Sequence, residues 1–300
     1  MAVASRARAG RAFTLVELLV MIFIIIVVAA LLIGVVLPNL GRSHGSLRPQ
    51  IKDSANIRGL AQGMVLFSQN NKDQYPLPSL LDAANNTVNA DPSTKDTTAN
   101  IISILIYGTF FGPEICVSPA ESNANIVMDN DYYYAEPPTA VNPKLALWDP
   151  AFSADFTAAT PGNFSYAHML PSGPRIAIWS NTFEATQAVL GNRGPLISGV
   201  AKLPSGKIAP QYNRSSNTRL IHGSRTEWEG KIAYNDNHVN YESSLWGDDS
   251  KIYMYKDTSG ALWPDLLHYD EPDDQLGTNN FLGIFTTSGK TPGEFRSIWD

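Results

Sequence analysis

The sequence predicts an α+β fold, in which a long N-terminal helix precedes a larger part built from short strands and long loops. Three observations support this prediction. An unbroken apolar run occupies residues 18–37, and apolar residues recur at helical spacing across residues 51–68. From residue 175 onward, short β-branched or aromatic runs alternate with turn-rich stretches. The chain has 300 residues, which is enough to bury a sizeable hydrophobic core.

The apolar run is long enough to cross a membrane as a helix. From Leu18 to Leu37 there are twenty residues without a charge, and at about 1.5 Å per residue they extend about 30 Å, the thickness of the hydrocarbon core. The apolar region of a secretory signal is usually shorter, about 7–15 residues. Three arginines precede the run and an acidic body follows it. This charge bias predicts a single-pass protein with a cytoplasmic N-terminus.

Glu17 stands at the start of this run, where a carboxylate is costly if it enters the membrane unpaired. One interpretation places Glu17 at the interface, where its charge favours a helix N-terminus through the dipole. The other interpretation comes from its neighbours. The stretch Ala12-Phe13-Thr14-Leu15-Val16-Glu17, preceded by a short basic leader, resembles the processing site of type IV prepilins and of the pseudopilins of type II secretion systems.

This resemblance implies a processing pathway and a set of partners. A prepilin peptidase would remove the leader, residues 1–12, by cutting between Ala12 and Phe13, and would methylate Phe13. The family usually has glycine before the cut, where this chain has Ala12. In assembly, Glu17 would pair with the freed amine on Phe13 of a neighbouring subunit. The implied partners are the peptidase, other pilin or pseudopilin subunits bound through the N-terminal helix, and the bacterial inner membrane.

The same resemblance assigns the rest of the chain. Residues 13–37 would form the transmembrane and assembly helix, and residues 38–75 a linker kinked near Pro38 followed by an amphipathic helix. Residues 76–300 would form a globular pilin-like domain, in the periplasm or in a surface filament. The expected fold is thus a long helix, with a membrane half and an amphipathic half, packed on an antiparallel sheet with large loop insertions.

Within this domain, local patterns predict individual elements. Residues 175–179, 196–200 and 230–241 have the β-branched and aromatic composition of strands. Residues 82–100 are polar and rich in turn-forming residues, which indicates a loop. Residues 101–111 are apolar throughout, so periodicity leaves a short helix and a buried strand equally open.

A second resemblance covers the C-terminal half. His222 and the later run Asp236-Asn237-His238-Val239 are similar to the His-x9-Asp-Gly motif of large pilin-like proteins of planctomycetes and related bacteria. Here thirteen residues separate His222 from Asp236 instead of nine. Asn237 replaces the motif's glycine and can also adopt the left-handed turn conformation.

His222, Asp236 and His238 are also the one local group with the composition of a metal site. The simpler interpretation is a hairpin turn whose histidines bond the backbone, because Asn and Asp readily serve turns. The sequence therefore predicts no bound metal and no cofactor. Calcium on the acidic residues 248–249 and 270–274 is the open alternative to a solvated acidic loop.

Composition excludes several classes of function. Lys and Arg number 22 and Asp and Glu 28, and three of the cations precede residue 12, so the body is acidic and nucleic acid is not expected as a partner. Cys116 is the single cysteine, which excludes an intrachain disulfide and predicts a buried structural thiol. Six tryptophans could pack the core or form a glycan-binding platform, and packing is favoured.

No nucleophile elbow, phosphate-binding loop or dinucleotide fingerprint occurs in the sequence, so an enzyme is not predicted. The predicted function is that of a structural subunit of a type IV pilus-like or type II secretion pseudopilus filament, processed by a prepilin peptidase and assembled through its N-terminal helix. The alternative is a membrane-anchored exported binding protein or hydrolase that uses the signal only as an anchor.

Overall fold

The structure is a computed structural model that describes residues 15–182, 184–223, 227–246 and 253–300. It divides into two compact units, Met1–Pro49 and Gln50–Asp300. Helix α1 (Leu15–Gln69) runs through residue 49 into the second unit and continues through Pro38. The predicted residues Ala12 and Phe13 lie outside the described residues.

The predicted fold class is wrong in its membrane half. In the part of the chain that the structure describes, no helix is both long enough and apolar enough to cross a membrane. This finding contradicts two predictions. One is the transmembrane helix expected over residues 13–37, and the other is the single-pass location in the inner membrane. Both predictions rested on the length of an apolar run.

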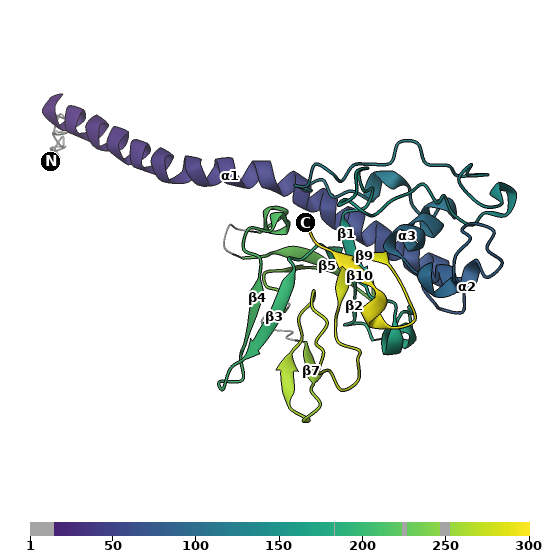
Figure 1. The fold of residues 1–300 in the computed structure, drawn as a ribbon. Coiled ribbons are helices and arrows are strands. Elements are labelled where there is room, and N and C mark those ends of the chain that lie inside the picture. Colours follow the sequence, from purple (N-terminus) through teal and green to yellow (C-terminus); the bar gives the residue numbers. More distant parts are fainter. Residues whose placement is uncertain (1–14, 183, 224–226, 247–252) are drawn as a thin grey trace, which may run out of the picture. The chain divides into compact units, whose positions relative to one another are not determined.

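The second unit is built mainly on an antiparallel sheet instead (Figure 1). Its strand order is β10-β9-β1-β2-β5-β6, and every neighbouring pair is antiparallel. These strands are β1 (Tyr166–Met169), β2 (Ala188–Asn192), β5 (Gly230–Tyr234), β6 (Val239–Glu242), β9 (Leu282–Thr287) and β10 (Arg296–Ile298). Two separate hairpins pair β3 (Ile197–Lys202) with β4 (Ile208–Tyr212), and β7 (Met254–Lys256) with β8 (Leu262–Pro264).

Besides α1, the helices of the described residues are short. They are α2 (Pro78–Leu81), α3 (Thr98–Tyr107) and the 3₁₀ turns η1 (Pro92–Thr94), η2 (Pro113–Ile115), η3 (Pro143–Leu145), η4 (Gly173–Ala177), η5 (Asn217–Leu220) and η6 (Pro292–Glu294). Five of these turns have proline at their first or second position, where its fixed φ suits the turn and its missing N–H costs nothing.

The segment that periodicity left open, residues 101–111, is mostly helix α3. The side chain of Thr97 accepts a hydrogen bond from the amide of Asn100 and caps the helix start. Ile101, Ile102, Leu105 and their neighbours are buried on several sides of this helix, which explains why the sequence shows no polar stripe. The strand predicted at residues 175–179 is wrong, because residues 175–177 belong to the 3₁₀ turn η4, which begins at Gly173 with a φ of 59°.

The predicted amphipathic helix lies within α1, and its apolar stripe enters the core. Ile57, Leu60 and Met64 recur at three- and four-residue spacing and are almost completely buried. Trp148, Trp179 and Trp228 are buried as well, so packing is confirmed for these three tryptophans. Cys116 is fully buried, and burial raises the pKa of its thiol, as expected of a structural cysteine.

Candidate functional site

A group of buried polar side chains surrounds Asp53 on α1. The Oδ1 atom of Asp53 accepts hydrogen bonds from Ser118 Oγ at 2.5 Å and from the hydroxyl of Tyr166 at 2.9 Å. Its Oδ2 atom accepts from Asn192 Nδ2 at 3.1 Å and from His222 Nε2 at 2.6 Å. Asp53 is 0% exposed. We call these five residues the Asp53 cluster.

Each member of the Asp53 cluster comes from a different element. Asp53 lies one helical turn before Ile57, on the buried face of α1. Tyr166 begins β1 and Asn192 ends β2, and the two residues are register partners in the sheet. Ser118 follows η2, and His222 follows η5. The cluster therefore joins the second half of α1 to the centre of the sheet and to two connecting segments.

The cluster holds Asp53 in its ionised form. Burial acts to raise the pKa of Asp53, but hydrogen bonds from His222 and Ser118, together with the charge on His222, hold it below its usual value. Lys231 on β5 lies nearby, and its Nζ donates to the carbonyl of Gln50 at 2.7 Å and to Ser54 Oγ at 2.5 Å. Burial lowers the pKa of Lys231, an effect that the charge of Asp53 opposes.

Because each carboxylate oxygen of Asp53 already accepts two hydrogen bonds, the cluster is suited to holding elements together rather than to acid–base chemistry on a substrate. The sequence patterns do not predict this cluster. The available signal was a carboxylate at residue 53 in line with the apolar stripe of Ile57, Leu60 and Met64, because a charge on a buried face requires partners.

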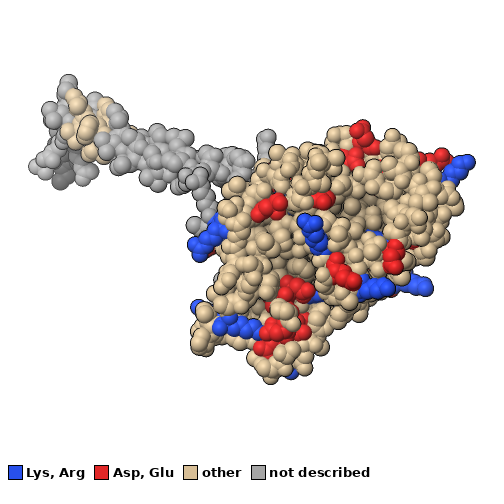
Figure 2. Space-filling view, viewed as in Figure 1, with Lys and Arg blue, Asp and Glu red and all other residues tan. Residues whose placement is uncertain are grey.

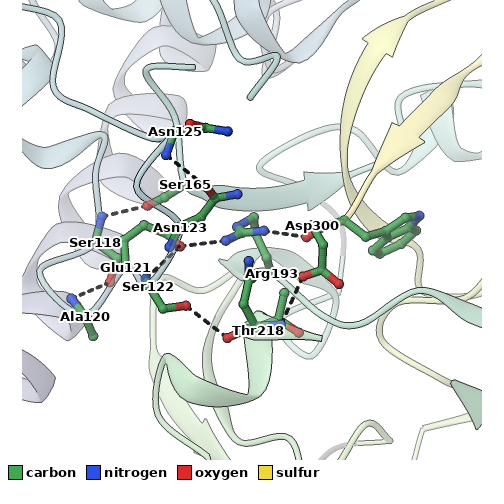
Figure 3. A network of polar contacts seen from close by, with 12 residues as sticks. Ser118, Ala120, Glu121, Ser122, Asn123, Asn125, Ser165, Arg193, Thr218 and Asp300 are labelled. Carbon is green, nitrogen blue, oxygen red and sulfur yellow. Dashed lines mark hydrogen bonds and ion pairs between the residues drawn. The ribbon is translucent and has the colours of Figure 1, made fainter. Parts of the chain in front are cut away.

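A second polar network continues from Ser118 toward the last residues of the chain (Figure 3). Ser118 binds Ser165 through its amide nitrogen, at 2.6 Å. Arg193, just beyond β2, forms an ion pair with Glu121 at 2.6 Å and donates to the carbonyl of Trp299. The side chains of Arg193 and Glu121 are both almost fully buried, so this ion pair fixes the connection after η2 to the end of β2.

The side chain of Asp300 completes this network. Its Oδ1 atom accepts hydrogen bonds from Ser216 Oγ at 3.0 Å and from the amide of Asn217 at 3.2 Å. Ser122 Oγ donates to the carbonyl of Asn217 at 3.0 Å. The guanidinium of Arg193 also lies over the ring of Phe156, 4.7 Å from its centroid. These contacts hold β10 and η5 against the centre of the unit.

The structure places the three predicted metal candidates in two different settings. His222 belongs to the Asp53 cluster, whereas His238 Nδ1 bonds the carboxylate of Asp236. The second pair lies in the turn between β5 and β6, where Asn237 has a φ of 67°, so the predicted left-handed turn at Asn237 is confirmed. Among the described residues, no group of three or more His, Cys, Asp or Glu side chains is arranged to hold a metal ion.

The acidic residues of the C-terminal part have protein partners. Asp270 pairs with Arg175 at 2.6 Å, and Asp273 pairs with Lys202 at 2.5 Å. Asp274 accepts hydrogen bonds from amides that follow it, including that of Thr278. Residues 248–249, the other acidic run considered for calcium, lie outside the described residues. The stretch 270–274 is thus tied into the fold rather than being a freely solvated loop.

Asp265 and Glu271 form a buried acid pair. Asp265 accepts hydrogen bonds from the amide and the side chain of Asn280, both at 2.9 Å. Glu271 accepts from the amide of Leu266 at 3.1 Å and from Asn279 Nδ2 at 2.5 Å. Burial raises the pKa of both carboxyls, and the charge of Asp265 raises that of Glu271 further. The pair therefore retains a proton at pH values where ordinary carboxyls have lost theirs.

The residues predicted for processing and assembly are not brought into a described site. Glu17 is part of α1, and the structure does not describe its side chain. The nearest described side chains are those of Leu19–Ile25, all of them exposed. On the face shown in Figure 2, Lys and Arg are scattered among Asp and Glu rather than gathered in one patch. The exclusion of nucleic acid stays a prediction.

Comparison with known proteins adds no relative. No family model matches this chain, and no curated protein or solved structure matches it either. The resemblance to pilin-like proteins stays a prediction from the sequence.

Proposed function

We propose that this chain is a structural subunit of a type IV pilus-like or type II secretion pseudopilus filament, and that it assembles through the N-terminal part of α1. The observation that supports this proposal most directly is the stretch Leu19–Ile25. Its seven consecutive side chains are all large and apolar, and each is between 49 and 65% exposed. An exposed apolar surface of this kind marks an interaction site.

The geometry of this stretch also favours one kind of partner. Seven consecutive residues complete about two turns of helix, so apolar side chains project on every side of it. A single groove would cover one side of such a helix. A bundle of like helices covers all of them, which is the environment at the centre of a filament.

A filament subunit must also transmit load from its assembly helix to its body. The second half of α1 meets this requirement, because the Asp53 cluster and the buried residues Ile57, Leu60 and Met64 attach it to the sheet. In the proposal, a prepilin peptidase cuts between Ala12 and Phe13. The methylated amine of Phe13 then pairs with Glu17 of a neighbour, where the low dielectric of the bundle makes an unpaired charge costly.

Single cysteines at Leu19 or Phe23 are expected to cross-link neighbouring subunits into covalent dimers when assembled protein is treated with a short bis-maleimide. The native Cys116 is buried and does not compete. A cysteine at Leu262 on β8, which is 64% exposed, is the matched control and is expected to give little cross-linking. Equal yields from Leu19, Phe23 and Leu262 would contradict assembly through α1.

Replacing Glu17 by valine is expected to abolish filaments in electron micrographs of sheared cells, whereas Glu17→Asp should retain them in part. The reason is that valine leaves the amine of the neighbouring Phe13 without a counter-charge. Intact-mass measurement of the native protein should show loss of residues 1–12 and one added methyl group. Filaments at the normal level in the valine variant would contradict assembly through the pairing of Glu17 with Phe13.

A further inference from the structure

Three side chains with complementary chemistry meet in the segment between α2 and α3. Lys95 Nζ donates to Asp82 Oδ2 at 2.8 Å and to Asn85 Oδ1 at 2.5 Å. It also donates to the backbone carbonyl of Asp82 at 2.5 Å. The side chains of Lys95 and Asp82 are both fully buried, whereas Asn85 is half-buried. An amine, a carboxylate and a carboxamide are thus in direct contact, the first two away from bulk water.

Two short helical turns hold these groups in place. Asp82 caps the C-terminal end of α2, and Lys95 caps the C-terminal end of η1. Asn85 has a φ of 57°, in the left-handed region that asparagine tolerates, and its amide donates to the carbonyl of Asp82 at 3.1 Å. The backbone amides of residues 86–88 donate to the carboxylate of Asp82 at 2.7 to 3.2 Å. The fold therefore sets the positions of all three groups.

The contact between Lys95 and Asn85 is one from which a covalent bond can form. A lysine amine is a nucleophile once it has lost its extra proton, and Cγ of asparagine is a carbonyl carbon. Because a C=O bond is about 1.2 Å long, Nζ lies no more than about 3.7 Å from Cγ, near the separation of about 3–3.5 Å from which attack begins. Groups held together in this way react far faster than the same groups free in solution.

Asp82 is placed to take the proton from Lys95. Burial acts to raise the pKa of Asp82, but hydrogen bonds from Lys95 and from backbone amides hold it below its usual value, so the carboxylate is ionised. Its Oδ2 atom is 2.8 Å from Nζ, within reach of direct proton transfer. Burial penalises both charges of the ion pair, which lowers the cost of this transfer. Because the ion pair is the resting state, a slow reaction after folding is expected.

We propose that Lys95 and Asn85 become joined by an isopeptide bond between Nζ and Cγ. The C–N bond forms as the bond between Cγ and Nδ2 of Asn85 breaks. Nζ gives up two of its three protons, both pass to Nδ2, the first by way of Asp82, and the nitrogen leaves as ammonium, so atoms and charge balance. Since Asn85 is half-buried, the ammonium ion can reach solvent. This inference does not depend on the proposed filament, because all three residues belong to the second compact unit.

Such a bond would fix the chain just before α3. The carbonyl of Lys95 accepts hydrogen bonds from the amide of Thr97 and from Asn100 Nδ2, both at 2.8 Å. Thr97 is the residue that caps the start of α3. A covalent link between residues 85 and 95 also restricts the unfolded chain, as a disulfide does. Trypsin is expected to leave the peptide bond after Lys95 uncut, because the amide has no positive charge.

Intact-mass measurement of the full chain, kept folded at mildly alkaline pH for several days, tests this reaction. The protein is expected to become lighter by one ammonia, and a digest should contain a branched peptide that joins Asn85 to Lys95. Asn85→Ala keeps the ion pair of Lys95 with Asp82 but has no carboxamide, so its mass should stay constant. Asn86→Ala is the matched control. It keeps the backbone hydrogen bond to Asp82 and should lose ammonia as the native chain does.

Lys95→Arg is the second test, because arginine keeps a positive charge beside Asp82 but does not give up its proton to become a nucleophile. Its mass is expected to stay constant. Loss of ammonia that persists in Lys95→Arg would indicate a cyclic imide at Asn85 and would overturn the proposal. Loss of water instead of ammonia would place the bond on Asp82 and overturn it too. So would an unchanged mass in a native chain whose circular dichroism shows that it is folded.

Discussion

Asp53→Ala is expected to lower the free energy of unfolding of the second compact unit by about 3–5 kcal/mol, the usual cost of breaking a buried charged network. The variant leaves four partners without their acceptor, among them the hydroxyls of Ser118 and Tyr166 and the buried ring of His222. Urea unfolding followed by near-UV circular dichroism measures this loss. Asp131→Ala, at an exposed carboxylate in a loop, serves as the matched control and should change stability by less than about 0.5 kcal/mol.

A double-mutant cycle separates the charge of Asp53 from its shape. Asp53→Asn keeps the volume of the side chain but removes the charge that faces His222. Combined with His222→Gln, it is expected to be non-additive by about 0.5–3 kcal/mol, because the two residues are in direct contact at 2.6 Å. An alanine variant that costs less than about 1 kcal/mol would show that the Asp53 cluster does not hold α1 to the sheet.

Stability is expected to fall as the pH rises from 6.5 to 9, because of the acid pair Asp265–Glu271. In the unfolded chain these carboxyls ionise near pH 4, whereas burial raises the pKa of both in the folded protein. The folded state therefore holds more protons than the unfolded state in this range. A carboxyl whose pKa is raised in the folded state makes its full contribution to the free energy of unfolding at pH values below its unfolded pKa. This contribution is lost as the pH rises through the folded pKa. The slope is about 1.4 kcal/mol per pH unit for each retained proton.

Asp265→Asn and Glu271→Gln should flatten this dependence, because a neutral amide needs no proton to remain buried. Asp270→Asn removes a partly exposed carboxylate from the same segment and should leave the slope as it is. His168 and His268 do not interfere. Burial lowers the pKa of both to about 4, so they stay neutral above pH 6.5. Equal slopes in the native protein and the Asp265→Asn variant would refute the role of the acid pair.

Local patterns in the sequence determined several elements by themselves. The three- and four-residue spacing of Ile57, Leu60 and Met64 predicts a helix with one buried face, because that spacing matches the helical period. The Asn-Asp-Asn run that ends at Asn237 predicts a tight turn, because asparagine tolerates a positive φ. Both predictions depend on interactions within a few residues, which is why they hold without knowledge of the rest of the chain.

Tertiary structure alone decided the features whose partners lie far away in the sequence. Residues 101–107 are helical, but the core surrounds them on several sides. The segment therefore has no polar stripe, and without one its periodicity does not distinguish a helix from a strand. The length of the apolar run after Glu17 predicts a membrane-spanning helix. Among the described residues, however, no helix is long and apolar enough to cross a membrane, so this prediction is wrong. Asp53 meets Ser118, Tyr166 and the rest of its cluster across separations of 65 to 169 residues. No local pattern encodes such a meeting, because it depends on the strand order that brings β1 and β2 beneath α1.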